Sequence, residues 1–489
     1  MSQPANVAVY IDANLSYPKE NFDPPETYPE YPHRHLKPNL ANKVYPAIRQ
    51  IFRQLKLDEA NYGTPEWNPL GESIHRGDKV VIKPNFVTHQ HPGGQQHLKA
   101  TITNASFLRT VLDYAIIAAG PEGRIDVVDG PLDMADLKQA LEVTGADRMF
   151  EDLRTNKGLN IPIIDLRKWS IHWEGGNVLR FDLPGDPRGY VTADLCGDSE
   201  LLREVNASII DKYRSTASFF QKNRMQEWHN TEHNYYSFSK TVMEADVFIN
   251  LPKMKTHKKG GVTLCLKNIV GVTDAKDTLP HHRVGSPFQG GDEFPDGSSS
   301  RMKLKAFLVD KIFSNPQGLA AYKLIKPLYN RLRSAGLYGR IDQRDRGEWY
   351  GNDTIWRTVL DLNKVLLYAD GEGKLHETRQ RRYFSLVDGI VAGEHNGPLR
   401  PTAVDCGCLV AGSDPVAVDL ACVRLMGLDW QKIPTYAHVK NINRYRIGSC
   451  DTEKIQICAN DPAYNDIFAS SKQIFSFKVP DGWTGAIEL

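Results

Sequence analysis

The fold is indicated most clearly by residues 245–268, which read Ala245-Asp246-Val247-Phe248-Ile249-Asn250-Leu251-Pro252-Lys253-Met254-Lys255-Thr256-His257-Lys258-Lys259-Gly260-Gly261-Val262-Thr263-Leu264-Cys265-Leu266-Lys267-Asn268. Residues 245–250 predict a buried strand, the basic residues after them predict a glycine-containing turn, and the next apolar segment predicts a short helix. A strand, a basic loop and a helix start form an anion site in α/β proteins, because the first backbone N–H groups of the helix and its dipole favour negative charge. The stretch therefore predicts an α/β fold with an anion site.

Strands and helices alternate on the N-terminal side of this stretch. We predict strands at Val7–Ile11, Asp78–Lys83 and Ile125–Val128, and helices at Lys43–Leu57, Asn104–Ala119 and 132–156. Residues 17–46 predict an extended arm, because they are rich in proline. Short apolar strands alternating with helices predict a mostly parallel sheet covered by helices.

The C-terminal half continues the pattern less regularly. We predict strands at Pro162–Leu166, Ala207–Asp211, Arg382–Val387 and Val404–Ala411, and a helix at Pro415–Met426. Residues 301–368 predict a helical insertion, and the last forty residues an irregular tail with one short strand. We expect a two-lobed protein with boundaries at 1–60 (strand, arm and helix), 61–300 (α/β lobe with the basic site), 301–368 (insertion) and 369–489 (second α/β part and tail).

The composition is that of an ordinary globular protein, with 24% charged and 41% hydrophobic residues and a formal net charge of +1. A charge near zero argues against nucleic-acid binding as the main role. The first six residues lack the features of a signal peptide, and no apolar segment approaches the roughly 20 residues that span a bilayer. We therefore expect a cytoplasmic protein without a transmembrane segment.

Cations and amides follow several of the predicted strands. In open parallel sheets ligands bind beyond the carboxyl ends of the strands. An exposed charge at a strand end would also explain Lys83 taken alone. The lysines after Asn250 lie beside apolar residues, where a buried cation needs a partner. The predicted anion ligands are Lys83, Asn85, Lys253, Lys267, Asn268, Gly260, Gly261 and His282. Lys255 and His257 are predicted catalytic residues; an ordinary histidine pKa near neutrality suits His257 to proton transfer.

Carboxylates follow other strands of the same sheet. Asp129 ends one strand, and Asp388 and Glu394 lie six apart on a predicted glycine-rich loop. Asp419 lies among apolar residues in the first turns of a helix for which Asp414 is a good N-cap. Asp388, Glu394, Asp419 and Asp129 are predicted ligands of Mg²⁺ or a similar divalent cation, with Asp388 and Glu394 as alternative acid–base groups. The alternative interpretations are a turn aspartate, a helix cap and a solvated glutamate.

Other motifs give weaker indications. His229-Asn230-Thr231-Glu232-His233 matches an inverted zinc-protease pattern, but its residues form helices poorly, so we do not expect a protease. Cys406 and Cys408 are two residues apart in a predicted strand, so we expect both thiols on one side. Such a pair is more typical of a core than of a metal site. Neither a Walker A pattern nor a strand followed by G-x-G-x-x-G occurs, so the sequence gives no standard signal for ATP or a nicotinamide cofactor.

Four motifs occur together in one known family. They are Lys83-Pro84-Asn85, Leu251-Pro252-Lys253 through Lys267-Asn268-Ile269-Val270-Gly271, Asp388-Gly389-Ile390 with Asn396-Gly397-Pro398, and Ser413-Asp414-Pro415-Val416-Ala417-Val418-Asp419. With them, roughly residues 75–430 resemble the uncharacterised family catalogued as domain of unknown function number 362. Many relatives have an added ferredoxin-like segment, so the resemblance implies a link to iron–sulfur proteins. The seven cysteines of this chain contain no C-x2-C-x2-C run, and we expect no intrinsic iron–sulfur cluster.

These observations lead to three functional hypotheses. The first is an enzyme that acts on a small phosphate- or carboxylate-bearing molecule, with a divalent cation as a candidate cofactor. The second is an accessory protein of an iron–sulfur system with an electron-transfer partner. The third is a binding protein that uses the same pocket without turnover. The sequence names neither a substrate nor a reaction.

Overall fold

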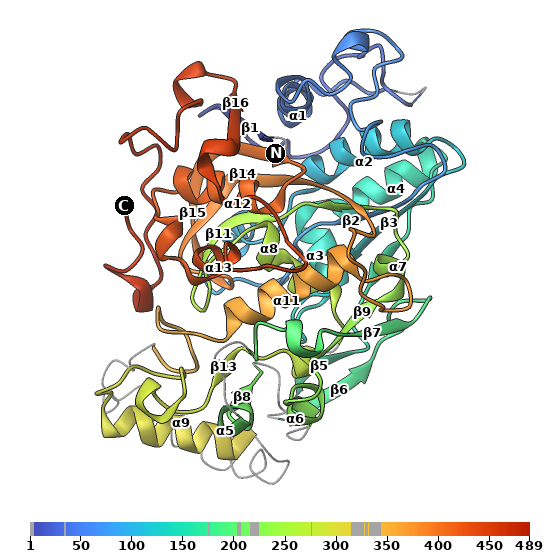
Figure 1. Cartoon of the computed structure of the whole chain (residues 1–489). Coiled ribbons are helices and arrows are strands. Elements are labelled where there is room, and N and C mark those ends of the chain that lie inside the picture. The colour runs from blue at the N-terminus through green and yellow to red at the C-terminus, as the bar shows by residue number, and fades with distance from the viewer. Residues whose placement is uncertain are drawn as a thin grey trace.

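The computed structural model contains one large central sheet between two layers of helices (Figure 1). It describes residues 4–33, 36–174, 177–202, 207–215, 224–274, 276–313, 327, 331 and 344–489. Within these ranges the sheet has ten strands. In spatial order, eight of them are β16 (Ile455–Ala459), β1 (Ala5–Ile11), β15 (Arg400–Gly412), β14 (Arg382–Asn396), β10 (Val247–Asn250), β2 (Lys79–Lys83), β3 (Arg124–Asp129) and β4 (Ile163–Asp165). β11 (Lys253–His257) pairs with β14, and β12 (Gly261–Thr263) pairs with β11.

Most pairings in this sheet are parallel, as predicted. The core runs parallel from β14 through β10, β2 and β3 to β4, with Val247 opposite both Val80 and Arg382. The antiparallel pairs are β1 with β15, β14 with β15, and the short hairpin of β11 and β12. The ends of β2, β10 and β3 therefore lie at one edge, where Lys83, Asn250 and Asp129 are the last strand residues.

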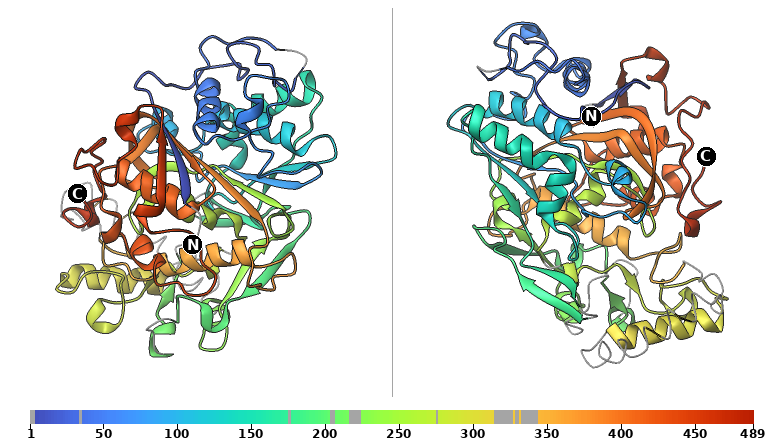
Figure 2. Two further views of the ribbon diagram at one scale, coloured as in Figure 1. Left: turned by 45° about the horizontal axis from the view of Figure 1, so that its top comes forward. Right: turned by 180° about the vertical axis from the view of Figure 1, so that it is seen from behind.

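Alternate residues of the strands divide the core into two layers. Val80 and Ile82 pack with α1 (Val44–Gln54), α2 (Ala105–Ala119), α3 (Leu137–Thr144) and α4 (Ala146–Asn156). Val81, between them, packs on the other face with α8 (Cys265–Asn268), α11 (Ile355–Tyr368), α12 (Pro415–Leu425) and α13 (Pro434–Val439). Figure 2 shows the first layer from behind. Successive side chains of a strand point to opposite faces, so an almost wholly apolar strand requires cover on both sides.

Smaller elements lie beside the main sheet (Figure 1). Three two-stranded sheets pair β5 (Trp169–Glu174) with β6 (Asn177–Asp182), β7 (Tyr190–Asp194) with β9 (Tyr235–Ser239), and β8 (Tyr213–Arg214) with β13 (His282–Arg283). The other α-helices among the described residues are α5 (Ala207–Ile210), α6 (Arg224–Trp228), α7 (Lys240–Met243) and α9 (Ser300–Phe313). No helix in the described ranges is both long and apolar enough to cross a membrane.

The predicted arm packs against the helices on one face of the sheet. Asp23 accepts from Arg109 of α2 at 2.8 Å and from Lys157 at 3.0 Å. Asp113 accepts from Arg109 at 2.9 Å and from His33 at 2.8 Å. These groups are almost fully buried, so the arm and the helices depend on each other for charge compensation.

Three sequence expectations about secondary structure are wrong. The strand predicted at Ala207–Asp211 is the helical turn α5, because a short apolar run does not distinguish strand from helix. The predicted basic turn is mostly strand β11. The predicted glycine-rich loop after Val387 continues β14 as far as Asn396. Glycine permits this continuation: a Cβ on Gly389 would lie 2.9 Å from a backbone oxygen of β15.

The central sheet joins parts of the chain that the sequence assigned to different domains. β1, β2 and β14 come from three of the four predicted segments and lie in this sheet. Of the predicted insertion, α9 and α11 are described, whereas 314–343, apart from 327 and 331, lies outside the described residues. The division into lobes stays a prediction.

Candidate functional site

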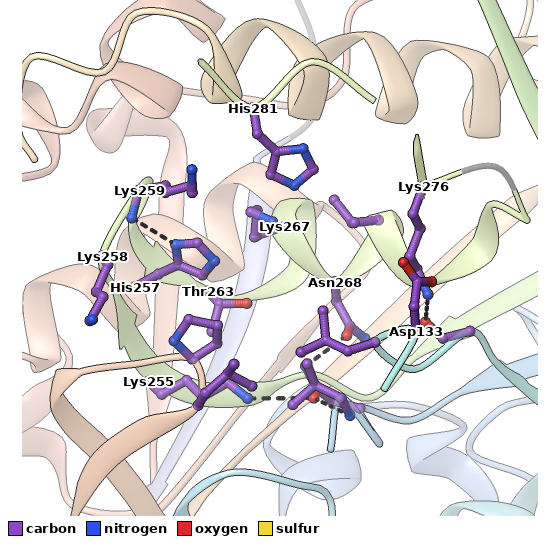
Figure 3. A pocket seen from close by; sticks show the side chains of 18 of the residues that line it. Asp133, Lys255, His257, Lys258, Lys259, Thr263, Lys267, Asn268, Lys276 and His281 are labelled. Atoms are coloured by element: carbon purple, nitrogen blue, oxygen red, sulfur yellow. Dashed lines mark hydrogen bonds between the residues drawn. The ribbon is translucent and has the colours of Figure 1, made fainter. Parts of the chain in front are cut away.

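A cavity of about 350 Å³ lies at the carboxyl ends of β2 and β3, and β11 forms one side of it. Its polar lining comes from these strand ends, from α8 and from the loops before β13 and α11 (Figure 3). The predicted site residues that line the cavity are Lys83, Asn85, Asp129, Lys255, His257, Lys267 and Asn268. The sheet topology places them together, since parallel strands end at one edge.

The floor of the cavity is a buried polar network around Lys83. Its ammonium donates to Asp129 Oδ1 at 2.7 Å, to the carbonyl of Pro84 at 2.9 Å and to Asn268 Oδ1 at 3.2 Å. Asn268 Oδ1 also accepts from Asn85 at 3.0 Å. Burial lowers the pKa of Lys83, and the charge of Asp129 opposes this shift. Lys83 is therefore held by protein groups, and its charge is already neutralised.

Lys255 lies beside this network, and no carboxylate of the described residues forms an ion pair with it. Its ammonium donates to the backbone carbonyl of Thr101 and lies 3.5 Å from Asn85 Oδ1. Burial, and then the charge of Lys253, lower the pKa of Lys255 well below its ordinary value. An amine in such surroundings is readily deprotonated in the empty cavity, and a bound anion would stabilise its charged form.

His257 ends β11 and turns its ring into the cavity (Figure 3). Its Nδ1 accepts from the backbone N–H groups of Lys259, at 3.1 Å, and Gly260, at 3.2 Å. Burial, and then Lys267, lower the pKa of His257 well below its ordinary value. The premise of the sequence prediction, a pKa near neutrality, is therefore not met in the empty cavity.

Lys267 and His281 face this ring from other elements (Figure 3). Burial lowers the pKa of Lys267 to about 8, and no described residue forms a hydrogen bond or an ion pair with its ammonium. His281 Nδ1 contacts the carbonyl of Leu279 at 2.8 Å. Lys267 is the cation that most requires a partner from outside the protein.

The far end of the cavity holds Lys276 and Asp133. Lys276 donates to the backbone carbonyls of Gly130 and Pro131, and burial lowers its pKa to about 8. Burial raises the pKa of Asp133 to about 6, against the opposing charge of Lys276. Asp133 thus titrates close to neutrality, which suits a proton-transfer group.

Positive charge exceeds negative charge in the described lining. The cations are Lys83, Lys255, Lys258, Lys259, Lys267, Lys276 and Arg346, and the carboxylates are Asp129, Asp133 and Glu348. Lys83 pairs with Asp129, and Lys258 pairs with Glu348 at 3.1 Å. Asp133 is therefore the one carboxylate of the described lining that is left to compensate the charge of the other five cations. Buried cations without counter-charges are unfavourable, so the empty cavity is suited to a ligand with negative charge.

Lys253 and Asp388 lie outside this lining, contrary to the prediction. They form a fully buried ion pair at 3.0 Å. Tyr17 of the arm donates to Asp388 at 2.5 Å, and its oxygen lies 2.6 Å from the Lys253 ammonium. Regular alternation would place Lys253 and Lys255, two residues apart, on one face of β11, but the register against β14 shifts between them, and Asp388 is the residue paired opposite Lys253. The cluster joins the arm to the sheet.

Asp419 already occupies the helix terminus that the sequence predicted as an anion site. It accepts from the backbone N–H groups of Cys265, at 2.7 Å, and Leu266, at 3.1 Å, at the start of α8. The Tyr436 hydroxyl also donates to it at 3.0 Å. The predicted free N–H groups of this helix are thus satisfied by a carboxylate of α12.

The remaining predicted residues have other partners. Glu394 accepts from the backbone N–H of Lys478 at 2.9 Å. Gly260 lies in the β11–β12 turn and Gly261 begins β12; a Cβ on Gly261, which has a φ of +76°, would lie 3.1 Å from Trp483. His282 lies in β13 outside the lining. Gly260 is likewise outside the lining and donates its N–H to His257 Nδ1.

The four predicted metal ligands do not converge. Asp129, Asp388, Glu394 and Asp419 each have a different protein partner. In the part of the chain that the structure describes, no three His, Cys, Asp or Glu side chains are grouped as metal ligands. Cys406 and Cys408 are buried in the core. In the zinc-protease pattern, His229 bonds the carbonyl of Thr278 and His233 bonds Asp194.

The sequence prediction missed several cavity residues. They include His281, the neighbour of the predicted ligand His282, and Asp133, Lys276 and Arg346, which belong to none of the motifs. The tandem His281-His282 was the available signal, since adjacent residues of an extended chain point in opposite directions and one of them faces the cavity.

Comparison with known proteins gives the family of the chain. The model of a domain of unknown function, DUF362, matches residues 171–424, and the chain belongs to this family. This confirms the resemblance drawn from the motifs, although the match begins later than residue 75. Lys83, Asn85 and Asp129 lie before the matched range. A search of curated proteins found no match.

Proposed function

We propose that this protein is an enzyme that acts on a small organic molecule bearing phosphate or carboxylate. The observation that supports the proposal most directly is Lys267, a cation in the cavity without a described partner. Lys255, Lys259 and Arg346 add positive charge around it. A dianionic group at this point would compensate several cations that the protein leaves uncompensated.

The cavity favours a compact ligand with an apolar part. A volume of about 350 Å³ is at the lower end of the roughly 300–1,000 Å³ of small-molecule sites. The apolar residues of the lining are Val87, Leu132, Met134, Ile171, Val270, Pro398 and Leu399. The charged group would lie at Lys267, and the carbon skeleton would lie against these apolar residues.

Catalysis is favoured over binding alone because groups suited to proton transfer lie in the same cavity. Asp133 has a pKa of about 6, and His257 and His281 line the same space. Perturbed titratable groups gathered in a cleft are typical of active sites. A divalent cation would arrive with the anion, and Asp129 and Asp133 are carboxylates of the lining that would hold it. A cytoplasmic location remains a prediction.

The proposal is tested by binding of matched ligand pairs. The purified protein is heated with a panel of phosphorylated and carboxylated metabolites and, separately, with the corresponding alcohols and amides. We expect the anions, and not their neutral analogues, to raise the melting temperature, because a ligand at 100 times its Kd stabilises the fold by about 2.7 kcal/mol. Equal effects of both sets, or of neither, would contradict the proposal.

Turnover distinguishes an enzyme from a sensor. Each stabilising ligand is incubated with the protein and followed by NMR. Conversion supports the enzyme, whereas tight binding without conversion would favour the non-catalytic binding protein.

A further inference from the structure

The tautomer of His281 is fixed by its backbone contact. Its Nδ1 lies 2.8 Å from the carbonyl oxygen of Leu279. A carbonyl oxygen only accepts, so Nδ1 must donate and must bear the proton. In the neutral ring Nε2 is then unprotonated and has a free lone pair.

The tautomer of His257 is fixed in the opposite sense. Its Nδ1 faces two backbone donors, the N–H groups of Lys259 at 3.1 Å and Gly260 at 3.2 Å. A ring nitrogen that accepts bears no proton, so the proton of the neutral ring is on Nε2. His257 therefore presents a hydrogen-bond donor where His281 presents an acceptor.

Both rings face the same ligand space. His257 and His281 line the cavity together with Lys267, and Figure 3 shows the two rings entering it from different elements. In the described part of the chain neither Nε2 atom has a hydrogen-bond partner. The two Nε2 atoms are thus complementary, because that of His257 donates a hydrogen bond and that of His281 accepts one, and both are open to a ligand.

We propose that His281 is the base and His257 the hydrogen-bond donor of the site, and that an anion bound in the cavity makes His281 a stronger base. This inference rests on the proposed function and adds a reaction class to it. The substrate class is a carbonyl compound with a hydrogen on the carbon beside the carbonyl and a phosphate or carboxylate for Lys267.

The proton transfer balances without an oxidant or a reductant. The Nε2 lone pair of His281 takes the proton of the C–H bond, and the bonding pair of that bond forms the carbon–carbon double bond of an enolate. The carbonyl π pair moves onto oxygen, to which His257 Nε2–H donates a hydrogen bond. Return of the proton from the His281 imidazolium to the same face restores the substrate, so this step alone exchanges the C–H hydrogen with solvent. An epimerisation follows where a second acid protonates the opposite face of the enolate.

The bound anion supplies the basicity that His281 lacks in the empty cavity. Burial, and then the charges of Lys267 and Lys259, lower the pKa of His281 well below its ordinary value. Arg346 acts in the same direction. An anion between these cations and the ring would offset their repulsion and raise that pKa. The base is therefore activated where and when the substrate is bound.

Histidine ¹⁵N NMR of the full chain tests this pair with sulfate as the probe. Sulfate has only acceptor oxygens, so it contacts His281 Nε2 only if that nitrogen is protonated. The variants His281→Asn and His257→Asn assign the two sets of signals. His229, buried outside the cavity lining with a pKa lowered to about 4, serves as the internal control.

Without sulfate we expect an unprotonated Nε2 on His281 and an unprotonated Nδ1 on His257. Saturating sulfate should raise the pKa of His281, followed by the pH dependence of its ¹⁵N shifts, and leave the pKa of His229 unchanged. The variant Lys267→Met should raise the pKa of His281 by about 1 unit without sulfate. Sulfate that binds by calorimetry but leaves the pKa of His281 unchanged, or the reverse tautomers, would overturn the inference while leaving the proposed function standing. Absence of anion binding would overturn both.

Discussion

Replacing Lys267 by methionine should greatly weaken anion binding without unfolding the protein. The side chain lies in the cavity, and its ammonium has no described partner. Methionine has a similar volume and length and no charge. The change therefore removes the proposed ligand contact and leaves no protein group unpaired.

The expected loss follows from the character of the contact. A hydrogen bond to a charged group contributes about 1.5–3 kcal/mol. Because every 1.4 kcal/mol is a factor of ten, sulfate should bind roughly 10–150 times more weakly to Lys267→Met. The free energy of unfolding should stay unchanged or rise, since the native lysine is desolvated without a compensating charge.

Calorimetric titration of sulfate into both proteins measures this loss, and urea unfolding confirms that the variant is folded. Lys472→Met is the matched control, because Lys472 is an exposed lysine outside the cavity lining. A folded Lys267→Met protein with unchanged sulfate affinity would refute the reasoning. An equal loss in Lys472→Met would show that sulfate binding is non-specific.

Four further outcomes are expected. Lys83→Met should lower the free energy of unfolding by about 3–5 kcal/mol, because it leaves Asp129 buried and unpaired; a loss under about 1 kcal/mol in urea unfolding would contradict the ion pair. Asp388→Asn should destabilise the protein but leave sulfate affinity unchanged, since Asp388 bonds Lys253 and Tyr17 outside the cavity; a large change in calorimetric affinity would place it in the site after all. Sulfate affinity should fall as pH rises through about 8, because Lys267 loses its proton there. Between about pH 8 and the ordinary lysine pKa, the free energy of unfolding should rise with pH, because the unfolded chain binds more protons than the folded chain. Lys267→Met should lose its share of both trends. Asn104→Ala should cost about 1 kcal/mol, since the Asn104 side chain accepts from Ser106 N at the start of α2; an unchanged midpoint of urea unfolding would refute the cap.

The sequence predicted the sheet and the place of the cavity because both depend on local patterns. Apolar strands such as residues 79–83 and 124–129 alternate with amphipathic helices, and polar residues such as Lys83 and Asp129 end them. Parallel pairing then requires those ends to meet at one edge. The Asn104 and Asp414 caps were predictable for the same reason, because a cap is a local interaction.

The sequence did not predict which lysine of β11 enters the cavity. Lys253 and Lys255 are both basic and both buried, yet Lys253 pairs with Asp388 and Lys255 lines the cavity. In a regular strand the two would share a face, and the register of β11 against β14 shifts between them, which no local pattern encodes. Asp419 was misassigned because its partners, the N–H groups of α8, lie more than 150 positions away. The choice between His281 and His282 likewise required the orientation of β13.

The central claim, that the cavity binds a small anion through its uncompensated lysines, is tested most directly by lysine labelling. The native protein is treated briefly with an amine-acylating reagent near pH 7.5, with and without sulfate, and each site is quantified by mass spectrometry. We predict that sulfate protects Lys267 and leaves Lys454, an exposed lysine with a raised pKa, unaffected. Equal labelling of Lys267 with and without saturating sulfate would contradict the account.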